Sequence, residues 1–180
     1  MGKVFAVEYL TLDGVMEEPS WSGPYFNDEL AAFQYDNLFE CDALLLGRVT
    51  YEGFAAAWPV ASDEQGFADR MNGIGKYVAS TTLTETKWNA TLLEGDVPAA
   101  VAKLKQSDQT LMIDGSAELV ESLRPHDLVD EYRLMVFPVV VGSGKRLFGP
   151  GGQSTLELVS VRTTTSGVAV MTYRPVARSA

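Results

Sequence analysis

Short apolar runs separated by polar, glycine-rich turns follow one another along the chain. Nearly unbroken runs are typical of strands buried on both faces of a sheet, and they lie at residues 3–10, 43–46, 76–80 and 110–113. The segments after these runs show helical spacing of apolar residues, at about 27–39, 48–57, 98–106 and 117–123. A long strand at 131–141, interrupted by Pro138, and two alternating strands at 155–163 and 168–173 complete the pattern.

Alternation of strands and helices, followed by three strands, predicts an α/β fold. We expect a mostly parallel central sheet with an antiparallel C-terminal hairpin. The chain has 180 residues, which is enough for one full core and short for two, so a single domain over residues 1–180 is predicted.

Four of the predicted strands end in polar or glycine-rich turns. These turns are Asp13–Gly14, Gly47–Arg48, Ser80–Thr81 and Asp114–Gly115–Ser116. In open α/β sheets, ligands bind outside the carboxyl ends of the strands. If the four strands are parallel neighbours, their turns converge on one edge and predict a cleft of nucleotide size.

The segment Gly47-Arg48-Val49-Thr50 has the parts of an anion site. The free N–H groups of a first helical turn and the helix dipole favour negative charge, and the Arg48 guanidinium offers a planar set of donors that matches phosphate. A second interpretation stays open, in which Gly47 only makes the turn and Arg48 is solvated.

Charge and composition exclude several classes of function. The formal net charge of −10 disfavours binding to nucleic acid. No apolar run approaches the roughly 20 residues of a membrane span, so we expect no membrane partner. The single Cys41 fits a reducing compartment, and we expect a cytoplasmic protein. With one Cys and one His, a Cys/His metal site is not expected.

Taken together, these turns resemble the dihydrofolate reductase-like superfamily, in particular its bacterial branch related to the C-terminal reductase domain of riboflavin biosynthesis. The resemblance extends from residue 3 to about 174. It is carried by the segments 11–14, 46–52, 58–59, 80–81, 114–119, 128–131 and 137–148. It implies a three-layer fold that binds NADPH across the carboxyl ends of the strands.

The resemblance also implies roles for particular residues. Gly47, Arg48 and Thr50 would hold the adenosine-side phosphates of NADPH. Ser80 and Thr81 would line the 2′-phosphate and the adenine, and Gly115 and Ser116 would take the pyrophosphate. The Asp13–Gly14 turn would lie by the nicotinamide and the substrate.

The implied function is an NADPH-dependent reductase that transfers hydride to a small planar C=N or C=O substrate, similar to a pteridine or a pyrimidine. Two departures bear on it. Asp114 stands where the family commonly has Gly, and Val15 stands where the riboflavin enzymes often carry Lys, which argues against a ribose-phosphate substrate. These departures leave open an alternative, a non-catalytic domain that binds a nucleotide or a partner.

Candidate groups for the chemistry lie in the first third of the chain. Glu29 or Asp28 resembles the carboxylate that supports protonation in the folate enzymes, and Asp13 or water is a further proton source. Both Glu29 and Asp28 are also explained as residues that cap a helix. Trp21, in a loop, and Phe33, on the following helix, are the predicted substrate contacts.

Two further expectations concern the C-terminal third. The segment Gly142-Ser143-Gly144-Lys145-Arg146 looks like a phosphate loop but fails the P-loop pattern, so we expect a structural loop. The long strand and the closing hairpin leave an exposed sheet edge that must be covered, which predicts a homodimer.

Overall fold

All eight strands of the computed structural model, which describes residues 1–150 and 152–177, join one mixed sheet. The strands are β1 (Val4–Thr11), β2 (Ala43–Gly47), β3 (Gly75–Ala79), β4 (Ala90–Leu92), β5 (Leu111–Asp114), β6 (Glu131–Phe137), β7 (Leu156–Thr163) and β8 (Ala169–Pro175). Their order is β4-β3-β2-β5-β1-β6-β8-β7. The strands from β4 to β6 run parallel, whereas β8 is antiparallel to both of its neighbours. The prediction of a mostly parallel sheet with an antiparallel C-terminal hairpin is confirmed.

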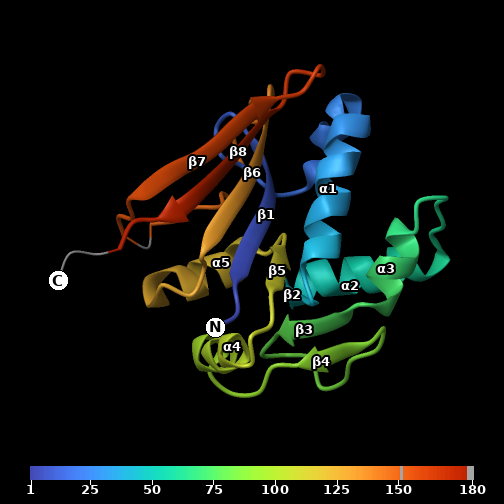
Figure 1. The fold of residues 1–180 in the computed structure, drawn as a ribbon, viewed down its shortest axis with the longest axis vertical. Helices are drawn as coiled ribbons and strands as arrows, with labels where there is room; N and C mark the ends of the chain where they lie inside the picture. Colours follow the sequence, from blue (N-terminus) through green and yellow to red (C-terminus); the bar gives the residue numbers. More distant parts are fainter. Residues whose placement is uncertain (151, 178–180) are drawn as a thin grey trace.

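Helices cover both faces of this sheet and complete three layers (Figure 1). One face carries α1 (Asp28–Glu40), α2 (Arg48–Ala57) and α3 (Phe67–Gly73), and the other carries α4 (Val97–Gln106) and α5 (Ala117–Leu123). Short 3₁₀ turns lie at η1 (Pro19–Tyr25), η2 (Trp58–Val60) and η3 (Arg124–His126). Each helical layer packs on its own cluster of buried apolar side chains. No helix of the described residues is long and apolar enough to cross a membrane.

Local chemistry fixes where the helices begin. The Asn27 side chain accepts a hydrogen bond from the backbone N–H of Leu30 at 3.2 Å, and Asp96 accepts one from Ala99 at 2.9 Å. Both are N-cap interactions that satisfy free N–H groups of a first turn. Pro98 lies in the first turn of α4, where its missing N–H costs nothing.

Two strand boundaries differ from the sequence pattern for backbone reasons. β6 ends at Phe137 and does not reach Val141, because Pro138 has no N–H to donate to the ladder. β4 does not appear among the apolar runs of the sequence pattern, and it begins only at Ala90. Trp88 and Asn89 have φ angles of 60° and 53°, in the left-handed region, which strand residues do not adopt.

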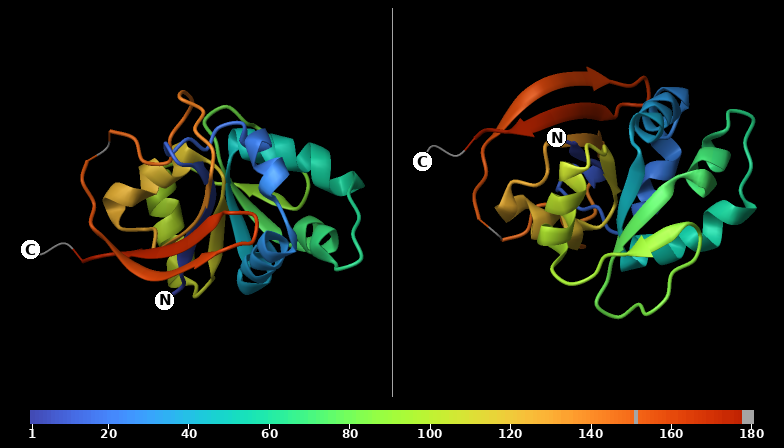
Figure 2. Two further views of the ribbon diagram at one scale, coloured as in Figure 1. Left: turned by 90° about the horizontal axis from the view of Figure 1, so that it is seen from above. Right: turned by 60° about the horizontal axis from the view of Figure 1, so that its bottom comes forward.

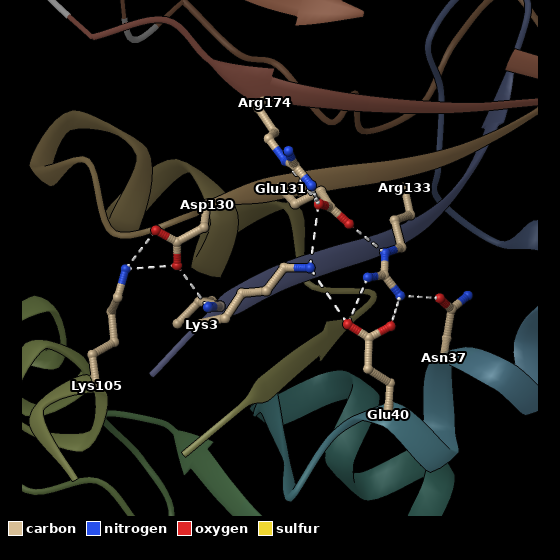
Figure 3. A network of polar contacts seen from close by, with 9 residues as sticks. Lys3, Asn37, Glu40, Lys105, Asp130, Glu131, Arg133 and Arg174 are labelled. Atoms are coloured by element: carbon tan, nitrogen blue, oxygen red, sulfur yellow. Dashed lines mark hydrogen bonds and ion pairs between the residues drawn. The ribbon is translucent and has the colours of Figure 1, made fainter. Parts of the chain in front are cut away.

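A network of ion pairs fastens α1 to the amino ends of the central strands (Figure 3). The Arg133 guanidinium on β6 bonds the Glu40 carboxylate at 2.6 and 2.9 Å and the buried Glu131 at 2.7 Å. It also lies 4.0 Å from the ring centroid of Phe5 on β1. These contacts hold α1 against the sheet at the end opposite the predicted cleft. Figure 2 shows the β7–β8 hairpin running past α1 on the same side of the molecule.

Candidate functional site

A cleft of about 1430 Å³ runs along the carboxyl ends of four adjacent parallel strands, β3, β2, β5 and β1. The helix after β2 lies on one face of the sheet and the helix after β5 lies on the other. A crevice therefore opens between β2 and β5, which is the switch point where open α/β sheets bind ligands. Three of the four turns singled out in the sequence lie at this cleft.

The turns after β2 and β5 are fastened to each other by the Ser116 hydroxyl. Its oxygen accepts a hydrogen bond from the Gly47 N–H at 2.7 Å and lies 3.1 Å from the Thr50 hydroxyl. A Cβ at Gly47 would come within 2.6 Å of that oxygen, and one at Gly115 within 2.9 Å of Thr50 Oγ1. Gly115 also has a φ of +68°, which favours glycine. Both glycines are thus required by the contact between the two turns.

The end of the cleft at β2 and β3 carries a cation and several hydroxyl groups. Arg48 lies there and bonds Glu52 one helical turn later, at 2.8 Å. Ser80 and Thr81 follow the end of β3, and the Ser80 hydroxyl accepts hydrogen bonds from the N–H groups of Thr82 and Leu83. Arg48 is exposed, so its guanidinium retains donors for a ligand.

Carboxyls outnumber cations along the cleft wall. Its charged side chains are Glu8, Glu17, Glu18, Asp63, Asp114 and Glu118, against Arg48 and Lys145. Lys145 is also paired with Glu118, at 2.7 Å. Arg48 and Lys145 are therefore each paired with a carboxylate, and an anionic ligand must compete with Glu52 or Glu118 for them.

Two of these carboxyls are set into the floor of the cleft on neighbouring strands. Glu8 on β1 is 1% exposed. Burial, followed by the nearby Asp114, raises the pKa of Glu8 well above its usual range. Burial also raises the pKa of Asp114 to about 7. Sequence reasoning noted Asp114 but missed Glu8. The available signal was a single carboxylate within the apolar run Val4–Leu10.

Aromatic and polar side chains from β1, α1, α2, α3 and the segments beside them form another wall. Tyr9 on β1 accepts a hydrogen bond from the Gln34 amide at 3.2 Å. The same wall includes Phe26, Ala31, Tyr35, Phe54, Trp58 and Phe67. Flat aromatic faces of this kind suit a planar ring.

The Asp13–Gly14 turn does not line the cleft and instead organises the loop after β6. The Asp13 carboxylate accepts hydrogen bonds from the Thr11 hydroxyl at 2.6 Å and from the N–H groups of Gly142 and Val141. These hydrogen bonds hold the pKa of Asp13 below its usual range, and the bond from Thr11 has the largest effect. The carbonyl oxygen of Gly14 accepts from Leu147 at 3.3 Å. The segment 142–146 is therefore part of a loop that is hydrogen-bonded to this turn.

Glu29 and Asp28 also lie outside the cleft, at the start of α1. The Glu29 carboxylate accepts hydrogen bonds from the Thr165 hydroxyl at 2.6 Å and the Thr165 N–H at 2.7 Å, and these bonds lower its pKa. Glu29 thereby ties α1 to the connection between β7 and β8. Asp28 is exposed in the first turn of α1.

Trp21 and Phe33, the predicted substrate contacts, pack at the edge of the apolar core and do not line the cleft. The Trp21 ring meets Phe137 at 5.4 Å between centroids, and its N–H donates to the Glu17 carbonyl. The Phe33 ring lies 4.9 Å from the Arg162 guanidinium. Of the residues named from the sequence, the cleft brings together Gly47, Arg48, Thr50, Ser80, Thr81, Gly115 and Ser116.

Comparison with known proteins agrees with this architecture. The Bacillus subtilis (strain 168) protein YyaP is 32% identical over 173 residues, which are 91% of this chain and 90% of that protein. A putative riboflavin biosynthesis protein from Shewanella sp. PV-4 superposes with a TM-score of 0.80 at 20% identity, over 97% of this chain and 99% of that one. Dihydrofolate reductase from Enterococcus faecalis superposes with a TM-score of 0.67 at 16% identity, over 97% and 96%.

The three-layer fold is thus shared with dihydrofolate reductase, as the resemblance implied. The model of the RibD C-terminal domain family matches residues 3–170. The chain belongs to the RibD C-terminal domain family and has a reductase-like fold.

Proposed function

We propose that the protein is an NADPH-dependent reductase that transfers hydride to a small planar substrate with a C=N or C=O bond, of pteridine or pyrimidine type. The observation that carries the proposal is the single cleft that joins the Gly47 and Gly115 turns to an aromatic wall. One part of it suits a dinucleotide and the other a planar ring. The Enterococcus dihydrofolate reductase with this fold is complexed with NADP(H).

The proposed cofactor contacts follow the chemistry of each turn. Gly47, Arg48 and Thr50 hold the adenosine-side phosphates. The free N–H groups in the first turn of α2 lie beside the Arg48 guanidinium, and both favour a negatively charged group. Ser80 and Thr81 contact the 2′-phosphate and the adenine. Gly115 and Ser116 approach the pyrophosphate. When bound, the cofactor supplies the hydride.

The protein's own part in the reaction is to orient the substrate and the cofactor. The wall that includes Tyr9, Tyr35 and Phe54 holds the ring flat. Asp13 and Glu29 accept hydrogen bonds and have lowered pKa values, so they hold no proton at neutral pH. Water that enters the cleft is our proposed source of the proton.

The excess of carboxyls along the cleft favours the second candidate function, a domain that binds a nucleotide or a partner without catalysis. Asp114 lies beside the proposed pyrophosphate position, where an ionised carboxylate would weaken the binding of NADPH. Turnover of a substrate with NADPH distinguishes the reductase from the non-catalytic binding domain.

The test is the consumption of NADPH in the presence of a panel of pteridines and pyrimidines. We expect turnover by the wild type with at least one of them. Gly53 lines the cleft and has open space at its Cβ, so Gly53→Trp should fill the cleft and abolish turnover. Gly73→Trp is the matched control, because Gly73 is also helical with open space but lies outside the cleft. Binding of NADPH without turnover of any panel member would favour the non-catalytic function.

We also propose a homodimer that works in the cytoplasm. β7 is the last strand of the sheet, and Leu158, Val159 and Val161 on it are 50%, 44% and 58% exposed. A long apolar edge strand invites pairing with another chain. The opposite edge of the sheet is β4, which has only three residues.

A further inference from the structure

Glu8 is the one charged residue of the central strand β1, and its side chain is buried at the cleft. Its neighbours two positions away, Ala6 and Leu10, pack in the apolar cluster under α4 and α5. Side chains alternate along a strand, so Glu8 extends from the same face. It is 1% exposed and lines the cleft next to Asp114 and Gly115.

The Glu8 carboxyl has a backbone hydrogen bond with Gly115, but one of its two oxygens is left unpaired in the part of the chain that the structure describes. Its Oε1 has no hydrogen-bond partner among the described residues. Within residues 1–150 and 152–177, no Lys or Arg forms an ion pair with Glu8 or with Asp114. An unsatisfied buried polar group destabilises the fold. Because Glu8 lines the cleft, a ligand bound there is placed to supply the missing partner.

The protonation state of Glu8 decides which ligand group suits it. Burial and the neighbouring Asp114 raise its pKa well above the usual range, against a smaller lowering by the Gly115 N–H, and so favour the neutral form of the carboxyl. A neutral carboxyl has one O–H donor and one carbonyl acceptor side by side. The complementary partner is an amide edge, in which a carbonyl oxygen adjoins an N–H. An anionic group at this place would meet Glu8 and Asp114 without any cation to balance it.

We propose that Glu8 binds a planar, uncharged amide edge of the ligand. The Glu8 O–H donates to the carbonyl oxygen of the ligand, and the Glu8 carbonyl accepts from the adjacent N–H. Asp114 beside it disfavours a carboxylate in the place of that amide edge. The inference rests on the proposed function, because two parts of that reaction present such an edge: the carboxamide of the dinucleotide and the lactam of a pteridine or pyrimidine.

The experiment measures dissociation constants by calorimetry for wild type, Glu8→Leu and Glu8→Gln. Leu removes both hydrogen-bonding groups and suits a buried strand, whereas Gln keeps one donor and one acceptor. Glu18→Gln is the control, because Glu18 also lines the cleft but is exposed. The probes are NADP⁺, its analogue with a carboxylate in place of the carboxamide, and 6-methylpterin.

We expect Glu8→Leu to weaken the binding of one probe with an amide edge by about tenfold, as the loss of paired hydrogen bonds predicts. Glu8→Gln and Glu18→Gln should stay within about threefold of wild type. If NADP⁺ is affected, wild type should also bind the carboxylate analogue at least about tenfold more weakly, and the cofactor is the source of the edge. If only 6-methylpterin is affected, the substrate is the source.

Equal binding of both amide probes by wild type and Glu8→Leu would overturn the inference while leaving the proposed reductase intact. Binding of 6-methylpterin that depends on Glu8, without any binding of NADP⁺, would support the inference and overturn the proposed cofactor. Failure of wild type to bind any of the probes would overturn both.

Discussion

At the scale of single residues, Glu8 and Asp114 in the cleft raise the proton affinity of the folded state above that of the unfolded chain. The pKa of Asp114 rises from 3.8 to about 7 on folding, so between these values the folded protein binds more protons than the unfolded chain. A raised acid pKa gives a contribution to stability that is present at low pH and is lost as the pH rises through the folded pKa.

We therefore predict that the free energy of unfolding of wild type falls between about pH 5 and pH 7, and that Asp114→Asn flattens this slope. The shift of Asp114 sets an upper bound of about 4 kcal/mol on its share. Glu8 acts in the same direction and leaves part of the slope in the variant. Urea denaturation of both proteins at several pH values measures the difference. Parallel profiles would show that Asp114 ionises as freely in the fold as in the unfolded chain.

The residues that sequence reasoning placed correctly at the cleft share one property. Gly47, Arg48, Ser80, Gly115 and Ser116 each directly follow or end a buried parallel strand, and topology alone brings such positions together. Their cofactor roles stay predictions. Glu8 is different, because it lies inside a strand and only the depth of burial reveals it.

At the scale of elements, the succession of strands and helices along the chain and the helix bounds follow well from pattern, caps and prolines. α2 and α5 lie within a residue of their expected bounds, because Gly47, Pro59 and Pro125 delimit them. Contacts between side chains that are distant in the sequence do not follow from these local signals. Glu29 meets Thr165, and Asp13 meets Gly142, through loops whose paths no local pattern encodes. Their predicted part in proton transfer remains a prediction.

The β7–β8 hairpin is the element on which the proposed dimer depends. Leu158 pairs across the hairpin with Tyr173, and Val161 pairs with Met171, so the four side chains share one face. Leu158 and Val161 are half or more exposed, and a second copy of the chain would cover them.

We predict that Val161→Glu converts a wild-type dimer into a monomer, because a carboxylate at that face would be buried without a partner. Val60→Glu is the matched control, since Val60 is 86% exposed at η2, away from the hairpin. Light scattering during size-exclusion chromatography gives the mass of each protein. A wild type that elutes as a monomer at working concentration would refute the dimer.

At the scale of the whole molecule, the charge distribution separates the two ends of the sheet. At the amino ends, Lys3, Arg133 and Arg174 are paired with Glu40 and Glu131 in one network (Figure 3). At the carboxyl ends, the cleft has six carboxyls and two cations. A chain of net charge −10 therefore depends on a local contact to attract a dinucleotide phosphate. Arg48 and Lys145 are the cleft cations with exposed donors, and Arg48 lies beside the Gly47 turn.

The central claim is that this cleft binds NADPH through the Gly47 turn. The most direct measurement is a calorimetric titration of wild type and Arg48→Ala with NADPH and with NADH. We predict that wild type prefers NADPH and that Arg48→Ala loses about tenfold or more of that preference, since a charged hydrogen bond contributes roughly 1.5–3 kcal/mol. NADH binding should change less, because NADH lacks the 2′-phosphate, the adenosine-side phosphate that Arg48 would hold together with Ser80 and Thr81. Equal affinities for NADPH in the two proteins, or no binding of either nucleotide at millimolar concentration, would contradict the account.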